Sequence, residues 1–125
     1  MFLFIVGCGD NHTVLILEDG TVYSFGSNDY GQLGHSRSRT RPEKVDGLDA
    51  HTIRHLACGS HHTLVLNEWG QVFAWGSNSF GQLGLNVSDQ IIHTPKMIKI
   101  LATKQVVQIA CGQNHSLALT NGESG

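Results

Sequence analysis

The chain has 125 residues, of which 14% are charged, and its formal net charge at pH 7 is −2. That length suits one ordinary domain, and the charge excludes both a globally basic nucleic-acid binder and a long acidic tail. Fifteen glycines stand against two prolines, and because regularly spaced glycine usually serves turns with positive φ, we expect many short strands.

In chain order, the opening "MFLFIV" predicts a strand, since it lacks the basic n-region of a signal peptide. Residues 13–28, "TVLILEDGTVYSFGSN", predict a hairpin with Asp19-Gly20 at its tip. Strands are also predicted within 53–59, 61–70, 71–78, 106–112 and 114–122, with Gly70 and Gly122 at the equivalent turns. No run approaches the roughly 18 apolar residues of a membrane span, so we expect no membrane partner.

A repeat of about fifty residues organises the chain. Residues 8–34 align without a gap on 58–84 and are identical at 14 of 27 positions, and a third copy begins at 111. Periods of this size indicate units that stack on neighbours to bury a core. We expect one repeat array over 1–125, divided into repeat 1 with its linker (1–57), repeat 2 with an insertion (58–110) and a truncated repeat 3 (111–125). The structural signature comprises Cys8, Gly9, His12, Gly20, Gly26, Asn28, Gly31 and Gly34, then Cys58, Gly59, His62, Gly70, Gly76, Asn78, Gly81 and Gly84, then Cys111, Gly112 and His115.

The signature "CGxxHTxxLxxxGxVYSFGxNxxGQLG" resembles the regulator of chromosome condensation repeat. This resemblance implies an all-β fold, a partial β-propeller with a little over two four-stranded blades of a seven-bladed type. The runs "DGTVYSFGSNDYGQLGH", "RPEKVDGLDA" and "GQVFAWGSNSFGQLGL" further resemble the N-terminal propeller of the HERC ubiquitin ligases. We therefore expect a fragment, a short isoform or an incomplete gene model, which further blades would complete.

The resemblance implies a non-catalytic protein-interaction module that recruits substrates or regulators for ubiquitination by a HECT domain absent from the chain. Two alternatives stay open: guanine-nucleotide exchange on a Ran-like small GTPase, and a fragment without function of its own. The chain has no GxxxxGK[ST], HExxH or GxSxG pattern, so no enzyme site and no cofactor are expected. Three cysteines, an odd number, favour a reducing compartment, hence the cytoplasm, with the nucleus as a second location.

The repeated Cys-Gly-x-x-His invites a zinc interpretation. Structural zinc needs four ligands, usually from tight pairs, and one Cys and one His from each of three blades do not obviously converge. We favour a structural role, with a small buried cysteine and a histidine that bonds backbone at the turn, and expect no metal.

Two features are candidate protein contacts. The stretch "HSRSRTRPEK" concentrates Arg37, Arg39, Arg41 and Lys44, half of the Lys and Arg of the chain. It is either a solvated loop, which we favour, or a loop that binds an acidic partner or phosphate. Trp69 stands at a hairpin tip, where it either anchors a partner or is covered by a neighbouring blade.

Overall fold

The structure is a computed structural model that describes residues 3–48, 52–85, 87–101 and 104–120. Blade 1 is an antiparallel sheet of β1 (Leu3–Cys8), β2 (His12–Leu17), β3 (Val22–Gly26) and β4 (Glu43–Lys44) in that order. Blade 2 repeats this order with β5 (Ile53–Cys58), β6 (His62–Asn67), β7 (Val72–Ser77) and β8 (Ile91–Met97). A short 3-10 helix, η1 (Lys99–Leu101), then leads to the hairpin of β9 (Val106–Cys111) and β10 (Ser116–Thr120).

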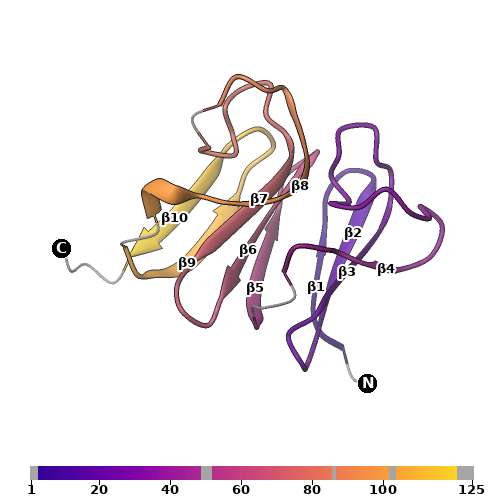
Figure 1. Cartoon of the computed structure of the whole chain (residues 1–125), viewed down its shortest axis with the longest axis horizontal. Helices are drawn as coiled ribbons and strands as arrows, with labels where there is room; N and C mark the ends of the chain where they lie inside the picture. Colours follow the sequence, from indigo (N-terminus) through magenta and orange to yellow (C-terminus); the bar gives the residue numbers. More distant parts are fainter. Residues whose placement is uncertain (1–2, 49–51, 86, 102–103, 121–125) are drawn as a thin grey trace.

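The three sheets lie side by side in chain order, with their strands running in similar directions (Figure 1). This arrangement confirms the expected all-β architecture of two four-stranded blades and the beginning of a third. Each blade starts before its cysteine, since β1 and β5 both end at one. The blades are therefore offset from the repeat as counted from Cys58. The described part of the chain holds no helix with the length and hydropathy that crossing a membrane requires.

The predicted hairpin tip at Asp19-Gly20 is confirmed by its hydrogen bonds. The Asp19 carboxylate accepts from both the backbone N–H and the hydroxyl of Thr21, at 3.0 and 2.7 Å. Gly20 has a φ of +87°, a conformation that glycine adopts without strain. At the equivalent tip of blade 2, Asn67 Oδ1 accepts the backbone N–H of Trp69. The predicted turn at Gly122 lies outside the described residues.

The hydrophobic core sits between the sheets. Strand β2 alternates buried and half-buried residues, as expected where one face of a sheet is covered. Every residue of β6 and β7 is buried, because blade 2 is packed between blade 1 and the β9–β10 hairpin. The largest fully buried side chains are Ile16, Leu33, Ile53, Leu64, Trp75 and Leu83. By contrast, Leu117 and Leu119 of β10 are 62% and 57% exposed.

The phrase "GSNxxGQLG" forms the turn that follows β3 and β7. Asn28 closes the first copy: its Oδ1 accepts the Leu33 N–H at 3.1 Å and its Nδ2 donates to the His35 carbonyl at 2.8 Å. Asn78 repeats the first bond with Leu83, at 3.3 Å. Each turn then presents its Gln carbonyl to the next sheet, which places it in the joint described below.

Candidate interaction surfaces

The histidines of the repeat signature join one blade to the next. His12 of β2 is buried, and its Nε2 lies 3.1 Å from the hydroxyl of Thr63 in β6. That hydroxyl donates its one hydrogen to the Gln32 carbonyl, at 3.4 Å. The imidazole must therefore donate from Nε2, so this nitrogen carries its proton. The result is a chain of hydrogen bonds that begins and ends in blade 1 and passes through blade 2.

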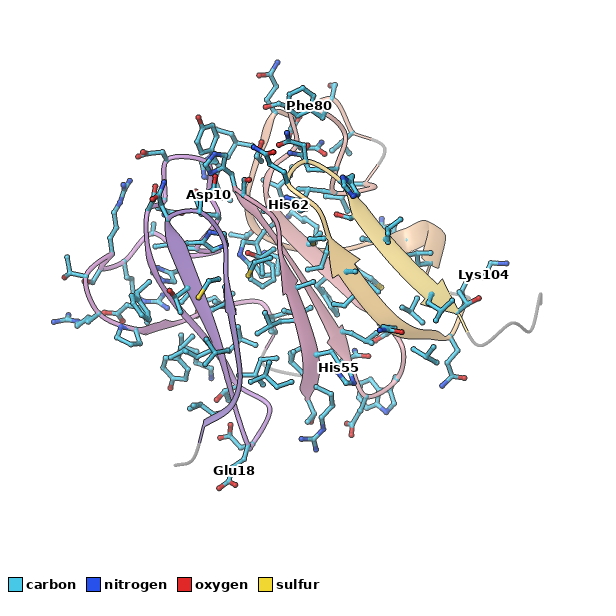
Figure 2. The ribbon with its side chains drawn as sticks, turned by 180° about the vertical axis from the view of Figure 1, so that it is seen from behind. Asp10, Glu18, His55, His62, Phe80 and Lys104 are labelled. Carbon is cyan, nitrogen blue, oxygen red and sulfur yellow. The ribbon has the colours of Figure 1, made fainter. Side chains whose placement is uncertain are left out.

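The same chain recurs between blade 2 and the third sheet. His62 Nε2 lies 3.0 Å from the Ser116 hydroxyl, which donates to the Gln82 carbonyl at 2.6 Å. His62 lies near the end of the sheets that carries Phe80, with Glu18 and His55 at the opposite end (Figure 2). His115, the third signature histidine, is exposed. A hydroxyl of the next sheet is thus a partner of both buried histidines, which the prediction of a bond to turn backbone did not include. His62 in addition has a backbone hydrogen bond with His115, at the turn between β9 and β10.

The glycine of the signature makes room for this imidazole. A Cβ on Gly59 would overlap the His62 ring and lie 2.8 Å from the Gly112 carbonyl oxygen of the third sheet. A Cβ on Gly9 would overlap the His12 ring and lie 2.6 Å from the Gly59 carbonyl oxygen. In the spacing Gly-x-x-His, the glycine therefore lets the histidine ring pack directly on the backbone, at the place where neighbouring sheets meet.

Burial keeps both connecting histidines neutral. It lowers the pKa of His12 to about 4, and the nearby His61 and His62 add to that effect. Burial likewise lowers the pKa of His62 to about 4. Within the described structure, Nδ1 of each ring is buried without a hydrogen-bond partner. A second proton on either ring would therefore be a buried, unpaired charge.

The signature cysteines line the hollow where β1, β5 and β9 end, beside Gly9, Gly59 and Gly112. Cys8 is exposed, so the prediction of a buried cysteine is wrong at this position, while Cys58 and Cys111 are half-buried. Burial raises the pKa of Cys58 to about 12 and that of Cys111 to about 11. Both thiols are therefore protonated at neutral pH. The described residues contain no cluster of three or more His, Cys, Asp or Glu side chains arranged for a metal ion.

The basic stretch forms the loop between β3 and β4, and its arginines are paired with acids of blade 1. Arg37 lies 2.8 Å from Asp46 and 3.5 Å from Glu43, and it also donates to the Lys44 carbonyl. Arg39 lies 3.1 Å from Asp29, and Arg41 lies 2.9 Å from Glu43. The side chains of all three arginines remain at least 41% exposed. Ion pairs thus hold this loop against blade 1, and they largely balance its positive charge.

Aromatic residues fall into two groups. Trp75 is fully buried in β7, and its indole N–H donates to the Gln32 carbonyl at 2.8 Å. Tyr30 of blade 1 stacks on His61 of blade 2, with ring centroids 4.3 Å apart. Trp69, at the tip between β6 and β7, is 58% exposed, and Phe80 is 72% exposed. The described surface therefore exposes both of these aromatic side chains, while Tyr30, at 40% exposed, is partly covered by its stacking on His61.

Sequence reasoning missed the partners of the signature histidines, namely Thr63, Ser116, Gln32 and Gln82. Gln32 and Gln82 stand in the repeated "GQLG", and Thr63 is the counterpart of Thr13. Their recurrence was a signal of structural importance. Nothing in the spacing, however, pairs a side chain of one repeat with a carbonyl of another.

Comparisons with known proteins agree with this geometry. The sequence profile "Regulator of chromosome condensation (RCC1) repeat" matches residues 19–66 and 70–119. The chain is 65% identical over 115 residues to the human "Probable E3 ubiquitin-protein ligase HERC4", which covers 92% of this chain and 11% of that protein. The chain therefore spans about a tenth of the length of this relative.

Among solved structures, human WBSCR16 superposes with a TM-score of 0.88 at 26% identity, over 95% of this chain and 31% of that one. Prp20p of Saccharomyces cerevisiae, described with its binding to Gsp1p and histones, superposes with a TM-score of 0.84 at 22% identity, over 93% of this chain and 30% of that one. At that identity the likeness to Prp20p concerns the fold alone.

Proposed function

Because the chain belongs to the regulator of chromosome condensation repeat family, we propose that it is a non-catalytic interaction module of the HERC-ligase type. On this proposal it recruits substrates or regulators, and ubiquitin transfer belongs to a HECT domain outside these 125 residues. The observation that carries the proposal is the 65% identity to HERC4 across 92% of the chain. Its three free cysteines suit a cytoplasmic location, with the nucleus as a second one.

The geometry of the blades supports this role. His12 and His62, the signature residues that could have been metal ligands, instead join neighbouring blades. Both are neutral, buried and hydrogen-bonded to the next sheet. What remains for function is the surface that a rigid sheet scaffold presents in its loops. On this proposal the scaffold binds a protein partner and catalyses no reaction itself.

Trp69 is the anchor that we assign to the partner contact. It is 58% exposed at a hairpin tip whose backbone is fixed by bonds to the Asn67 side chain. A large aromatic side chain on a fixed turn binds with little loss of conformational entropy, and tryptophan is enriched at the energetic centres of interfaces. We assign a second contact to the loop of Arg37, Arg39, Arg41 and Lys44, because its paired arginines keep at least 41% of their side chains exposed.

The proposal is tested with two immobilised baits, the chain and its Trp69→Ser variant. Proteins captured from cytoplasmic extract are purified individually and titrated against both. We expect at least one to bind the chain directly and the variant about 30-fold more weakly, the loss typical of an interface anchor. Excess chain should also lower ubiquitin conjugation of that protein in the extract. Direct partners that bind both baits equally would contradict the role of Trp69, and the absence of any direct partner would contradict the module.

Nucleotide exchange is the competing function, and it has a separate readout. Release of a fluorescent GDP analogue from a Ran-like GTPase is followed with and without the chain. We expect the intrinsic release rate in both cases. Acceleration by the chain at micromolar concentration would replace the recruitment proposal with an exchange factor.

A further inference from the structure

A cavity of about 320 Å³ lies beside β8, the last strand of blade 2 in sheet order. Its other wall is the loop that follows the second "GQLG" turn. The Asn78 side chain fixes this loop, since its Nδ2 donates to the carbonyls of Val87 and Asp89, at 3.3 and 2.9 Å. The lining consists of apolar Leu85, Val87, Ile92 and Met97 and of charged Asp89, Lys96 and Lys99. The cavity is thus a preformed apolar space with charged side chains in its wall.

The corresponding place in blade 1 is occupied by an arginine. The register of β8 on β7 repeats that of β4 on β3, so that residues of the lining have counterparts in blade 1. Four such pairs are Arg37 and Val87, Glu43 and Lys96, Lys44 and Met97, and Asp46 and Lys99. The Arg37 guanidinium donates to the Lys44 carbonyl, and it lies 2.8 Å from Asp46 and 3.5 Å from Glu43. In blade 1 a cation therefore lies between two acids.

Blade 2 lacks the arginine and carries the opposite charges around its place. Val87 stands where blade 1 has Arg37, and Lys96 and Lys99 stand where it has acids. Within the described residues, neither lysine has a carboxylate at ion-pair distance. Two lysines against Asp89 leave the lining with a net positive charge. The place that holds a cation in blade 1 thus suits an anion beside apolar surface in blade 2.

A neighbouring blade leaves this place open to solvent. Blade 1 has all four strands of blade 2 beside it, yet the side chains of Arg37 and Asp46 are 41% and 64% exposed. In blade 2, Val87 is 47% exposed. The accessibility of the cavity therefore follows from its position at the outer strand of a blade, whatever blade comes next.

We propose that this cavity binds a segment of a partner protein that carries an aspartate or glutamate next to a large apolar residue. The carboxylate lies between Lys96 and Lys99, which hold it by charge-assisted hydrogen bonds. The apolar side chain enters the space that Val87 leaves open. Ligand pockets measure roughly 300–1,000 Å³, so a volume near the lower end suits one or two side chains. The inference rests on the proposed function and adds to it the chemistry of one partner segment.

The experiment selects short random peptides, displayed on phage, that bind the full chain. Phage that bind a variant with a filled cavity, Val87→Arg with Lys96→Glu and Lys99→Asp, are removed first. This variant rebuilds the arrangement of blade 1 and should keep the circular dichroism of the unmodified chain. We expect the surviving peptides to carry an acid next to Leu, Ile, Met or Phe.

The selected peptides are then synthesised with a label and titrated by fluorescence anisotropy. We expect one-to-one binding that weakens as salt is raised, because exposed charges are screened. Replacing the acid of the peptide by its amide should weaken binding at least about tenfold.

Matched variants of the chain locate the site. Lys96→Glu should weaken binding at least about tenfold, whereas Lys104→Glu, the same change of charge outside the cavity, should change it less than about twofold. The variant with Lys96→Glu and Lys99→Asp should bind peptides in which the acid is replaced by arginine. Trp69→Ser should bind the selected peptides as the unmodified chain does, so that this site and the Trp69 contact fail or succeed separately.

Three results would overturn the proposal: no peptide survives the depletion, the survivors lack an acid, or Lys96→Glu and Lys104→Glu weaken binding equally. Two other occupants are tested in the same way. Displacement of the peptide by decanoate at equal affinity would make a fatty acid the occupant. A dimer of the chain, seen by sedimentation and lost in the filled variant, would make it a second copy. Either result would also overturn the proposal.

Discussion

His12 Nε2 in blade 1 lies 3.1 Å from the Thr63 hydroxyl in blade 2, a residue 51 positions further along the chain. Because that hydroxyl donates onward to the Gln32 carbonyl, one histidine ties β2 to the next blade and, through it, to its own "GQLG" turn. The repeat signature is therefore the joint of a scaffold.

The first prediction concerns the glycine under the imidazole. Gly59→Ala places a methyl group where the His62 ring and the Gly112 carbonyl already lie. We expect a loss of about 2 kcal/mol or more in the free energy of unfolding, measured by urea denaturation, since neither neighbour can yield without opening the joint. The exposed Ser79→Ala should change stability by less than about 0.5 kcal/mol. Equal stabilities for the two variants would show that the imidazole does not need this space.

The second prediction is a loss of stability in acid. The pKa of His12 and of His62 is about 4 in the folded chain, and that of an unfolded histidine is about 6.5. The unfolded state therefore binds more protons below pH 6.5, and stability falls as the pH drops from 6.5 towards 4. At pH 4, each of the two histidines should lower the free energy of unfolding by roughly 3 kcal/mol relative to neutral pH.

The pH effect has its own control. His62→Gln keeps a side-chain donor but removes one titrating ring. Between pH 6 and pH 4.5 it should lower the slope of unfolding free energy against pH by about 1.4 kcal/mol per unit, the value for one proton. A slope unchanged by this substitution would mean that the His62 ring titrates normally in the folded chain.

Much of this fold is predictable from the sequence because its signals are local. The Asp19-Gly20 tip follows from turn chemistry, and the strands follow from alternation between glycines. The partner of His12 does not follow, because Thr63 is brought near by stacking of sheets and no periodicity within one repeat encodes it. For the same reason, the exposure of Cys8 depends on which sheet covers it and not on its own neighbours in sequence.

The basic loop shows a second limit. Its positive residues are plain in the sequence, as is Glu43 among them, but the other two acids that balance them lie outside the stretch 35–44: Asp29 precedes it and Asp46 follows it. Counting charges along the stretch predicts a patch. In the folded chain the acidic side chains lie next to the arginines, so that the stretch forms a set of ion pairs and not a positively charged patch.

The third prediction separates the two tryptophans. Trp75→Phe removes the indole donor to the Gln32 carbonyl from a fully buried site and should cost about 1–3 kcal/mol. Trp69→Phe, at a site 58% exposed, should cost less than about 0.5 kcal/mol. Urea unfolding followed by circular dichroism measures both. Emission from the Trp69→Phe variant should be that of a buried indole, and a solvent-exposed spectrum would contradict the packing of Trp75.

The fourth prediction addresses the tied loop. Arg37→Gln and Asp46→Asn remove the same ion pair from opposite sides. Both should accelerate tryptic cleavage after Arg39, because Arg37 holds the two ends of the loop together. Global stability should hardly change, since pairs on the surface contribute little. Cleavage rates equal to those of the unmodified chain would show that the loop is ordered by other contacts.

The central claim, that the signature histidine is a joint between blades, is tested most directly by a double-mutant cycle. The free energy of unfolding is measured for the chain, for His12→Phe, for Thr63→Val and for the double variant. We predict a coupling of roughly 1–2 kcal/mol between these residues, as expected for two side chains in one buried hydrogen-bonded chain. Additivity within about 0.5 kcal/mol, the behaviour of independent sites, would contradict it.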